Sequence, residues 1–81
     1  MDEIESKVIE IVAKILQIDK SKVTPQSRIV EDLGADSLLQ VEISMAIDAT
    51  FNIYTNDEES SKISTIADAV SLVKQKVAEG K

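Results

Sequence analysis

SLLQVEISMAIDATF, residues 37–51, predicts a helix with two apolar faces. One face consists of Ile43, Ile47 and Phe51. The other lies on nearly the opposite side and consists of Leu38, Val41 and Met45, hereafter the second stripe. A surface helix of a globular protein normally needs only one apolar face. One face can enter a core, so the second stripe needs an explanation of its own.

Polar side chains separate the two faces, with Glu42 on one flank and Gln40, Ser44 and Asp48 on the other. The second stripe is either buried by another helix or left exposed for a partner protein. Leaving three such side chains in water forgoes roughly 1.5–3 kcal/mol each, which is a large sum for a small domain. We therefore favour a partner surface, with a central helix buried on both sides as the alternative.

Upstream of residue 37 the sequence predicts one helix and then a long ordered loop. The helix spans about residues 2–17, because its apolar side chains recur at helical spacing: Ile4, Val8, Ile11 and Ile15. Residues 18–36 form a loop, and a loop of that length normally has a function or contains hidden structure. We expect one helical turn near residues 28–32. We also expect four apolar loop residues to reach the core: Val23, Ile29, Val30 and Leu33.

Downstream of residue 51 the sequence contains two capping boxes. Asn56 with Glu59 opens a short third helix, and Thr65 with Asp68 opens a last helix over residues 66–78. No stretch alternates with a period of two, so no sheet is expected. The predicted fold is all-α, a small four-helix bundle with three long helices and one short one, in a single domain of residues 1–81.

The composition argues against catalysis and metal binding. The chain has no histidine and no cysteine, which removes the usual general base and the commonest metal ligands. No apolar run is long enough to span a membrane, and the acidic start is unlike a signal peptide. We expect a cytoplasmic monomer with no membrane insertion, no metal and no catalytic residue, and thus not an enzyme.

Negative charge is concentrated in the middle of the chain. The formal net charge is −6, and residues 29–61 contain eight carboxylates and no lysine or arginine. Nucleic-acid binding needs clustered basic side chains, so nucleic acid is excluded as a partner. The acidic surface favours basic protein partners, whose approach is steered by charge and weakened by salt.

Ser37 stands where the loop becomes a helix, and the residues around it allow two interpretations. As a structural residue it caps the helix in a capping box with Gln40, while Asp36 is an alternative cap; either cap is worth about 1 kcal/mol. As a functional residue it is a hydroxyl to be modified, since no catalytic triad or Gly-x-Ser-x-Gly elbow makes it a nucleophile. A phosphate there would be favoured by the helix dipole and opposed by the neighbouring carboxylates.

The chain resembles acyl carrier proteins at their phosphopantetheine attachment region. The resemblance rests on EDLGADSL at residues 31–38, followed by Val41-Glu42 and Met45-Ala46-Ile47. Asp57-Glu58-Glu59 and Lys62-Ile63 resemble the family's third helix. It implies that Ser37 is esterified by 4′-phosphopantetheine from coenzyme A, whose thiol holds growing acyl chains as thioesters in type II fatty acid biosynthesis.

The resemblance also implies roles for other residues. Asp36 helps to present Ser37 to a phosphopantetheinyl transferase (holo-carrier synthase). Partner contacts fall on Leu38, Val41, Glu42, Met45 and Asp48, which would face basic docking patches of acyl-transferring and fatty-acid-synthase enzymes. Candidates for an acyl pocket are Ile29, Ile47, Phe51 and Ile63, all of which also suit a plain core.

Several residues depart from the family pattern and keep alternatives open. Leu39 and Tyr54 add apolar surface, and Ala49-Thr50 replaces an acidic pair. One alternative is therefore a specialised carrier for polyketide, aminoacyl or other acyl groups. An alternative from another class is a non-covalent helical adaptor that uses the second stripe and needs Ser37 only as a cap.

Overall fold

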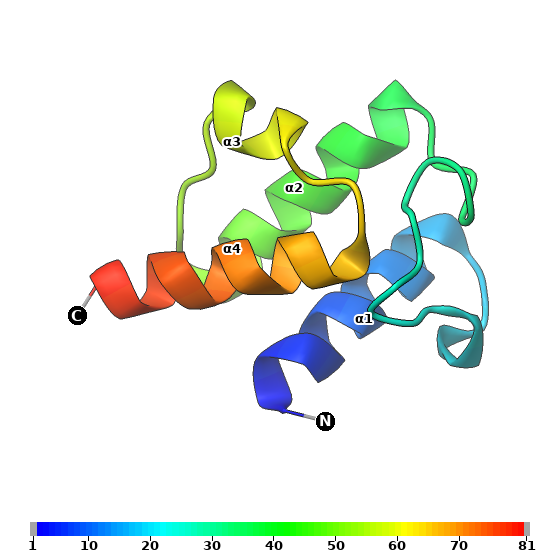
Figure 1. Cartoon of the computed structure of the whole chain (residues 1–81), viewed down its shortest axis with the longest axis horizontal. Helices are drawn as coiled ribbons and strands as arrows, with labels where there is room; N and C mark the ends of the chain where they lie inside the picture. Colours follow the sequence, from blue (N-terminus) through cyan, green and yellow to red (C-terminus); the bar gives the residue numbers. More distant parts are fainter. Residues whose placement is uncertain (1, 81) are drawn as a thin grey trace.

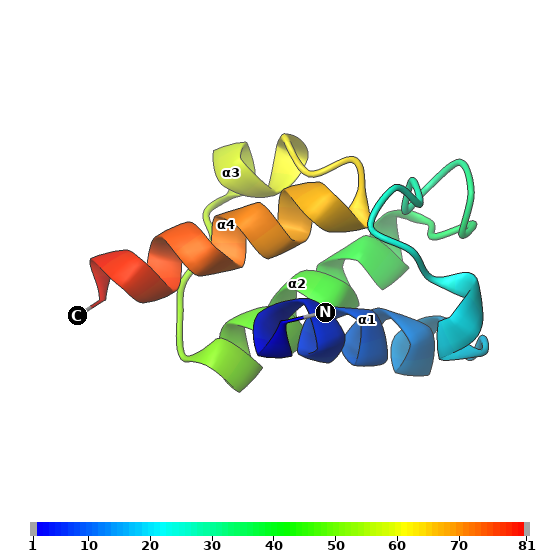
Figure 2. The same ribbon diagram turned by 60° about the horizontal axis from the view of Figure 1, so that its bottom comes forward.

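The computed structural model describes residues 2–80, which form four α-helices and one short 3-10 helix (Figure 1). In chain order these are α1 (Glu3–Leu16), η1 (Lys20–Lys22), α2 (Ser37–Phe51), α3 (Asp57–Ser61) and α4 (Ile66–Glu79). No strand occurs in residues 2–80, so the predicted all-α bundle of three long helices and one short helix is confirmed. In both Figure 1 and Figure 2, α4 lies between α3 and α1, and α2 packs against α1.

Local sequence accounts for the helix ends. Asp2 caps α1 by accepting a hydrogen bond from the backbone N–H of Glu5 at 2.7 Å. The two capping boxes predicted downstream of residue 51 form, at Asn56 for α3 and at Thr65 for α4. In each box two otherwise unpaired backbone groups of the first turn gain partners. The predicted bounds of α1, α2 and α4 are correct to within one residue, and α3 begins directly after its predicted cap, Asn56.

The core lies where α1 meets α2 and α4. Its fully buried side chains come from α1 and α4: Val8, Val12, Ile66 and Val73. The predicted inner face of α2 joins them, because Ile43 and Ile47 are buried and Phe51 packs partly buried against the cluster. The three long helices, α1, α2 and α4, thus each present one apolar side to the centre, whereas α3 contributes no buried residue.

The loop between α1 and α2 is ordered by hydrogen bonds to the start of α4. The N–H of Ile29 donates to the carbonyl of Ser64 at 2.9 Å, and the N–H of Ile66 donates to the carbonyl of Ser27 at 3.1 Å. The predicted turn near residues 28–32 is present, since the N–H of Asp32 donates to the carbonyl of Arg28 at 2.9 Å. η1 was not predicted.

One expectation about this loop is wrong. Val23 and Ile29 are buried and Leu33 packs against the core, but Val30 is 45% exposed. The backbone bond from Ile29 to Ser64 directs the Ile29 side chain inward. Val30 is the next residue in the turn, and its side chain stays largely in solvent.

Candidate functional site

Ser37 is the first residue of α2, and Asp36 is the cap of that helix. The carboxylate of Asp36 accepts a hydrogen bond from the N–H of Leu39 at 2.8 Å. Gln40 donates to the backbone carbonyl of Asp36 at 3.4 Å and forms no capping box with Ser37. The interpretation of Ser37 as the cap is therefore wrong. Its side chain is exposed, and no hydrogen bond of its hydroxyl is found among residues 2–80.

The residues before Ser37 hold it in a fixed place. Ala35 is buried and anchors the chain two residues before α2 begins. Gly34 has φ +76°, in the left-handed region that favours glycine, and its N–H donates to the carbonyl of Val30 at 3.0 Å. The loop therefore delivers an exposed hydroxyl from a packed base.

Arg28 moderates the acidic surroundings of this loop. Its guanidinium donates two hydrogen bonds to Asp32, at 3.1 and 3.2 Å, and lies 3.9 Å from a carboxylate oxygen of Glu31. The side-chain bond from Arg28 lowers the pKa of Asp32 below its ordinary value. Two of the carboxylates expected to oppose a phosphate near Ser37 are thus paired with a cation.

The second stripe is exposed on α2. The exposed fractions are 67% for Leu38, 54% for Val41 and 66% for Met45. The alternative of a helix buried on both sides is therefore wrong. Tyr54, just beyond α2, is 73% exposed and enlarges the apolar surface as predicted. Leu39 does not enlarge it, because its side chain packs against the core.

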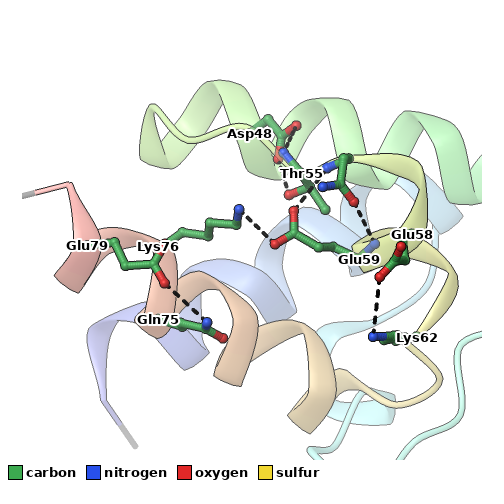
Figure 3. Close-up of polar contacts among 9 residues, drawn as sticks. Asp48, Thr55, Glu58, Glu59, Lys62, Gln75, Lys76 and Glu79 are labelled. Atoms are coloured by element: carbon green, nitrogen blue, oxygen red, sulfur yellow. Dashed lines mark hydrogen bonds and ion pairs between the residues drawn. The ribbon is translucent and has the colours of Figure 1, made fainter.

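The acidic residues named as partner contacts differ in their surroundings. Glu42 is exposed on α2. Asp48 is half-buried, and its two carboxylate oxygens accept hydrogen bonds from the N–H and the hydroxyl of Thr55, at 3.1 and 2.7 Å (Figure 3). Asp48 therefore fixes the segment that leads from α2 to α3.

An ion pair holds α3 against α4. The ammonium of Lys76 lies 2.8 Å from a carboxylate oxygen of Glu59, and both side chains are largely covered (Figure 3). The hydrogen bond from Lys76, followed by that from the N–H of Asn56, lowers the pKa of Glu59. The same contact raises the pKa of Lys76. The pair is stronger than the exposed pair of Glu58 with Lys62, at 3.7 Å.

The lowered pKa of Glu59 predicts a loss of stability in acid. Because the pKa of Glu59 is lower in the folded protein than its ordinary value of 4.5, the ionised carboxylate stabilises the fold at pH values above 4.5. This contribution is lost as the pH falls through the folded-state pKa. We expect the unfolding free energy, measured with urea, to fall less between pH 7 and pH 4 in Glu59→Gln than in the unchanged protein. Glu58→Gln is the control, and equal differences in all three proteins would contradict the prediction.

A small cavity of about 30 Å³ lies between α2, α3 and the start of α4. Three of the four candidate pocket residues line it: Ile29, Ile47 and Ile63. Phe51 does not; it lines a surface depression with residues of α1 and α4. The cavity has room for little more than a water molecule, so a longer ligand enters only if α2 and α3 separate.

Three polar residues at this cavity were not among the predicted site residues: Gln40, Ser44 and Ser60. The hydroxyls of Ser44 and Ser60 lie 3.2 Å apart in hydrogen-bond contact between α2 and α3. The sequence did contain a signal for two of them. Gln40, Ser44 and Asp48 recur every four residues on one flank of α2, and that flank faces α3 and the segment before it.

Residues 2–80 contain neither a metal-binding cluster nor a membrane-spanning helix. In residues 2–80 no three histidine, cysteine, aspartate or glutamate side chains are grouped so that they could hold a metal ion. Within the same residues, no helix has the length and apolar character needed to cross a membrane.

Comparison with known proteins gives one consistent family. A family model described as "Phosphopantetheine attachment site" matches residues 6–73. An "Acyl carrier protein" of Rickettsia canadensis (strain McKiel) is 48% identical over 75 residues, which are 93% of this chain and 87% of the relative. Acyl carrier proteins of Rickettsia typhi (strain Wilmington) and Rickettsia prowazekii (strain Madrid E) are 47% identical over the same shares.

Proposed function

The chain belongs to the phosphopantetheine-binding family of acyl carrier proteins, and on that premise we propose that Ser37 is its attachment residue. The chain is an acyl carrier of fatty acid biosynthesis with covalently bound 4′-phosphopantetheine. The arm supplies a terminal thiol on which acyl groups are held as thioesters. Members of this family carry acyl groups and do not catalyse their conversion; the proposal includes that this chain is not an enzyme.

The observation that carries the proposal is the unused, exposed hydroxyl of Ser37 at the start of α2. Because Asp36 already caps the helix, nothing in the local fold requires a hydroxyl at residue 37. A phosphate ester there would be stabilised by the positive end of the helix dipole, by roughly 0.3–1 kcal/mol. Arg28 weakens the opposing field, since it pairs with Asp32 and Glu31.

The residues around Ser37 fit a long polar arm. A groove begins at Ser37 and runs between α2 and α3 past the side chains of Gln40 and Ser44. These side chains offer both donors and acceptors, which suit the amide groups of a pantetheine. Asp36 would act as a positioning residue, because its bond to Leu39 holds the first turn of α2 in place.

Family members generally work with a phosphopantetheinyl transferase and with enzymes of fatty acid synthesis. For this chain the proposed contact surface is the second stripe together with Glu42, and Asp57 lies next to it, since it lines the same groove as Val41 and Met45. Basic patches on the enzymes would be attracted by the carboxylates, which speeds encounter without requiring tight binding. Asp48 would serve this surface indirectly, by holding Thr55. A cytoplasmic, monomeric protein remains part of the proposal.

Whole-protein mass spectrometry tests the proposal. The chain, produced without the arm, is incubated with coenzyme A and a phosphopantetheinyl transferase. We expect a mass increase of one phosphopantetheine, located at Ser37 by sequencing the modified peptide. No increase, or a modified residue other than Ser37, would overturn the proposal. The alternative of a non-covalent adaptor needed Ser37 as the cap of α2. Asp36 is the cap, so the adaptor alternative no longer explains why residue 37 is a serine.

A further inference from the structure

Two hollows between α2 and α3 meet at a set of polar side chains. The outer hollow is the groove that begins at Ser37, and the inner one is the small cavity described above. The residues that line both are Gln40, Ser44 and Ser60, hereafter the polar threshold. Beyond the threshold the cavity is lined by apolar side chains, namely Ile29, Ile43, Ile47, Ile63 and Ala69. A group passing from the groove into the cavity must cross the threshold.

The hydrogen bond between Ser44 and Ser60 closes this passage. It joins α2 to α3, and both hydroxyls are partly buried. A chain that passes between the two helices separates the hydroxyls and removes their mutual hydrogen bond. A saturated hydrocarbon offers no replacement partner, and a partly buried hydroxyl without a partner is unfavourable.

An acyl group attached through Ser37 enters with a defined direction. Its free end reaches the isoleucine-lined cavity first, while its thioester end remains towards the groove. The carbons at the threshold are then those nearest the thioester. An oxygen on one of these carbons can exchange hydrogen bonds with Ser44 and Ser60 in place of the bond that was lost.

On the basis of the carrier function proposed above, we infer that Ser44 and Ser60 make this pocket selective for oxygenated acyl groups. The preferred class has an oxygen close to the thioester, as in 3-hydroxyacyl and 3-oxoacyl groups. Saturated acyl groups of the same length are sheltered less and stay longer in the groove, open to partner enzymes. The carrier would thus distinguish the stages of chain reduction by how deeply it holds the acyl group.

Methyl NMR of the loaded protein tests this selectivity. Octanoyl and 3-hydroxyoctanoyl groups are attached to Ser37 through a non-hydrolysable pantetheine amide, and loading is verified by mass. The δ-methyl signals of Ile47 and Ile63 are compared with those of the protein bearing the bare arm. We expect the sheltered fraction to be higher for 3-hydroxyoctanoyl, with a bound-to-open ratio on the order of tenfold larger, as for one hydrogen bond regained.

Two variants separate the hydroxyl pair from general effects of the cargo. In Ser44→Ala/Ser60→Ala the threshold loses its hydroxyls, so the preference should vanish and the octanoyl signal should shift further. Ser61→Ala is the matched control: Ser61 lines only the groove, and its hydroxyl donates to the carbonyl of Glu58 at 2.7 Å. This variant should keep the preference.

The outcomes distinguish this inference from the carrier proposal. No mass increase on loading overturns both. Successful loading followed by equal methyl shifts for the two acyl groups overturns only the selectivity. A preference that survives in Ser44→Ala/Ser60→Ala also overturns it, because the hydroxyl pair would then not be its source.

Discussion

Replacing Ser37 by alanine should abolish phosphopantetheine attachment and all acyl loading while leaving the fold intact. The Ser37 hydroxyl has no partner among residues 2–80, and the cap of α2 comes from Asp36. The expected change in unfolding free energy is therefore within about 0.5 kcal/mol, as for an ordinary surface substitution. Mass spectrometry after incubation with coenzyme A and a transferase, paired with urea unfolding, measures both quantities.

Asp36→Ala is the control, because it should lower the stability of the fold while keeping the hydroxyl to which the arm is attached. It removes the carboxylate that accepts from the N–H of Leu39, so the unfolding free energy should fall by about 1 kcal/mol. The Ser37 hydroxyl remains, and some attachment should still be detected after long incubation. If Ser37→Ala were the less stable of the two variants, Ser37 would be a structural residue after all. A retained mass increase in Ser37→Ala would place the arm elsewhere.

The sequence predicted the helices well because their ends are set by neighbouring residues. The Asn56 and Thr65 boxes each involve residues only three apart. The two apolar faces of α2 could also be predicted from the sequence, since they follow from helical geometry within one element. That Leu38 and Met45 remain exposed required only that the small bundle had nothing left to cover them.

The errors arose where distant segments decide the outcome. Val30 is exposed because the bond from Ile29 to Ser64 sets the orientation of the loop, and no local pattern predicts a bond across that separation. Leu39 packs inward although it is a neighbour of the second stripe. Ser60 was not predicted as a site residue because its role depends on its hydrogen-bond contact with Ser44, which lies on another helix. The polar threshold is thus a tertiary feature.

Met45→Asp should slow the transfer reactions of partner enzymes by at least about tenfold, with little change in stability. Met45 is 66% exposed in the middle of α2, at the edge of the groove that begins at Ser37, so a charge there meets water in the free protein. In a docked complex the same charge would replace an apolar contact, and losses of about 2 kcal/mol are typical of central interface residues. The measurement is kcat/KM for phosphopantetheine attachment and for acyl loading, together with urea unfolding.

Thr50→Asp adds the same charge to an exposed residue about 140° further round α2, away from the second stripe. The two variants distinguish electrostatic steering from apolar contact, because the two explanations predict changes of kcat/KM in different directions. If attraction between carboxylates and basic patches governs docking, an added negative charge should speed encounter in both variants. If the second stripe is the contact, Met45→Asp is slowed and Thr50→Asp is unchanged or slightly faster. Equal rates for both variants would mean that enzymes do not dock on the second stripe.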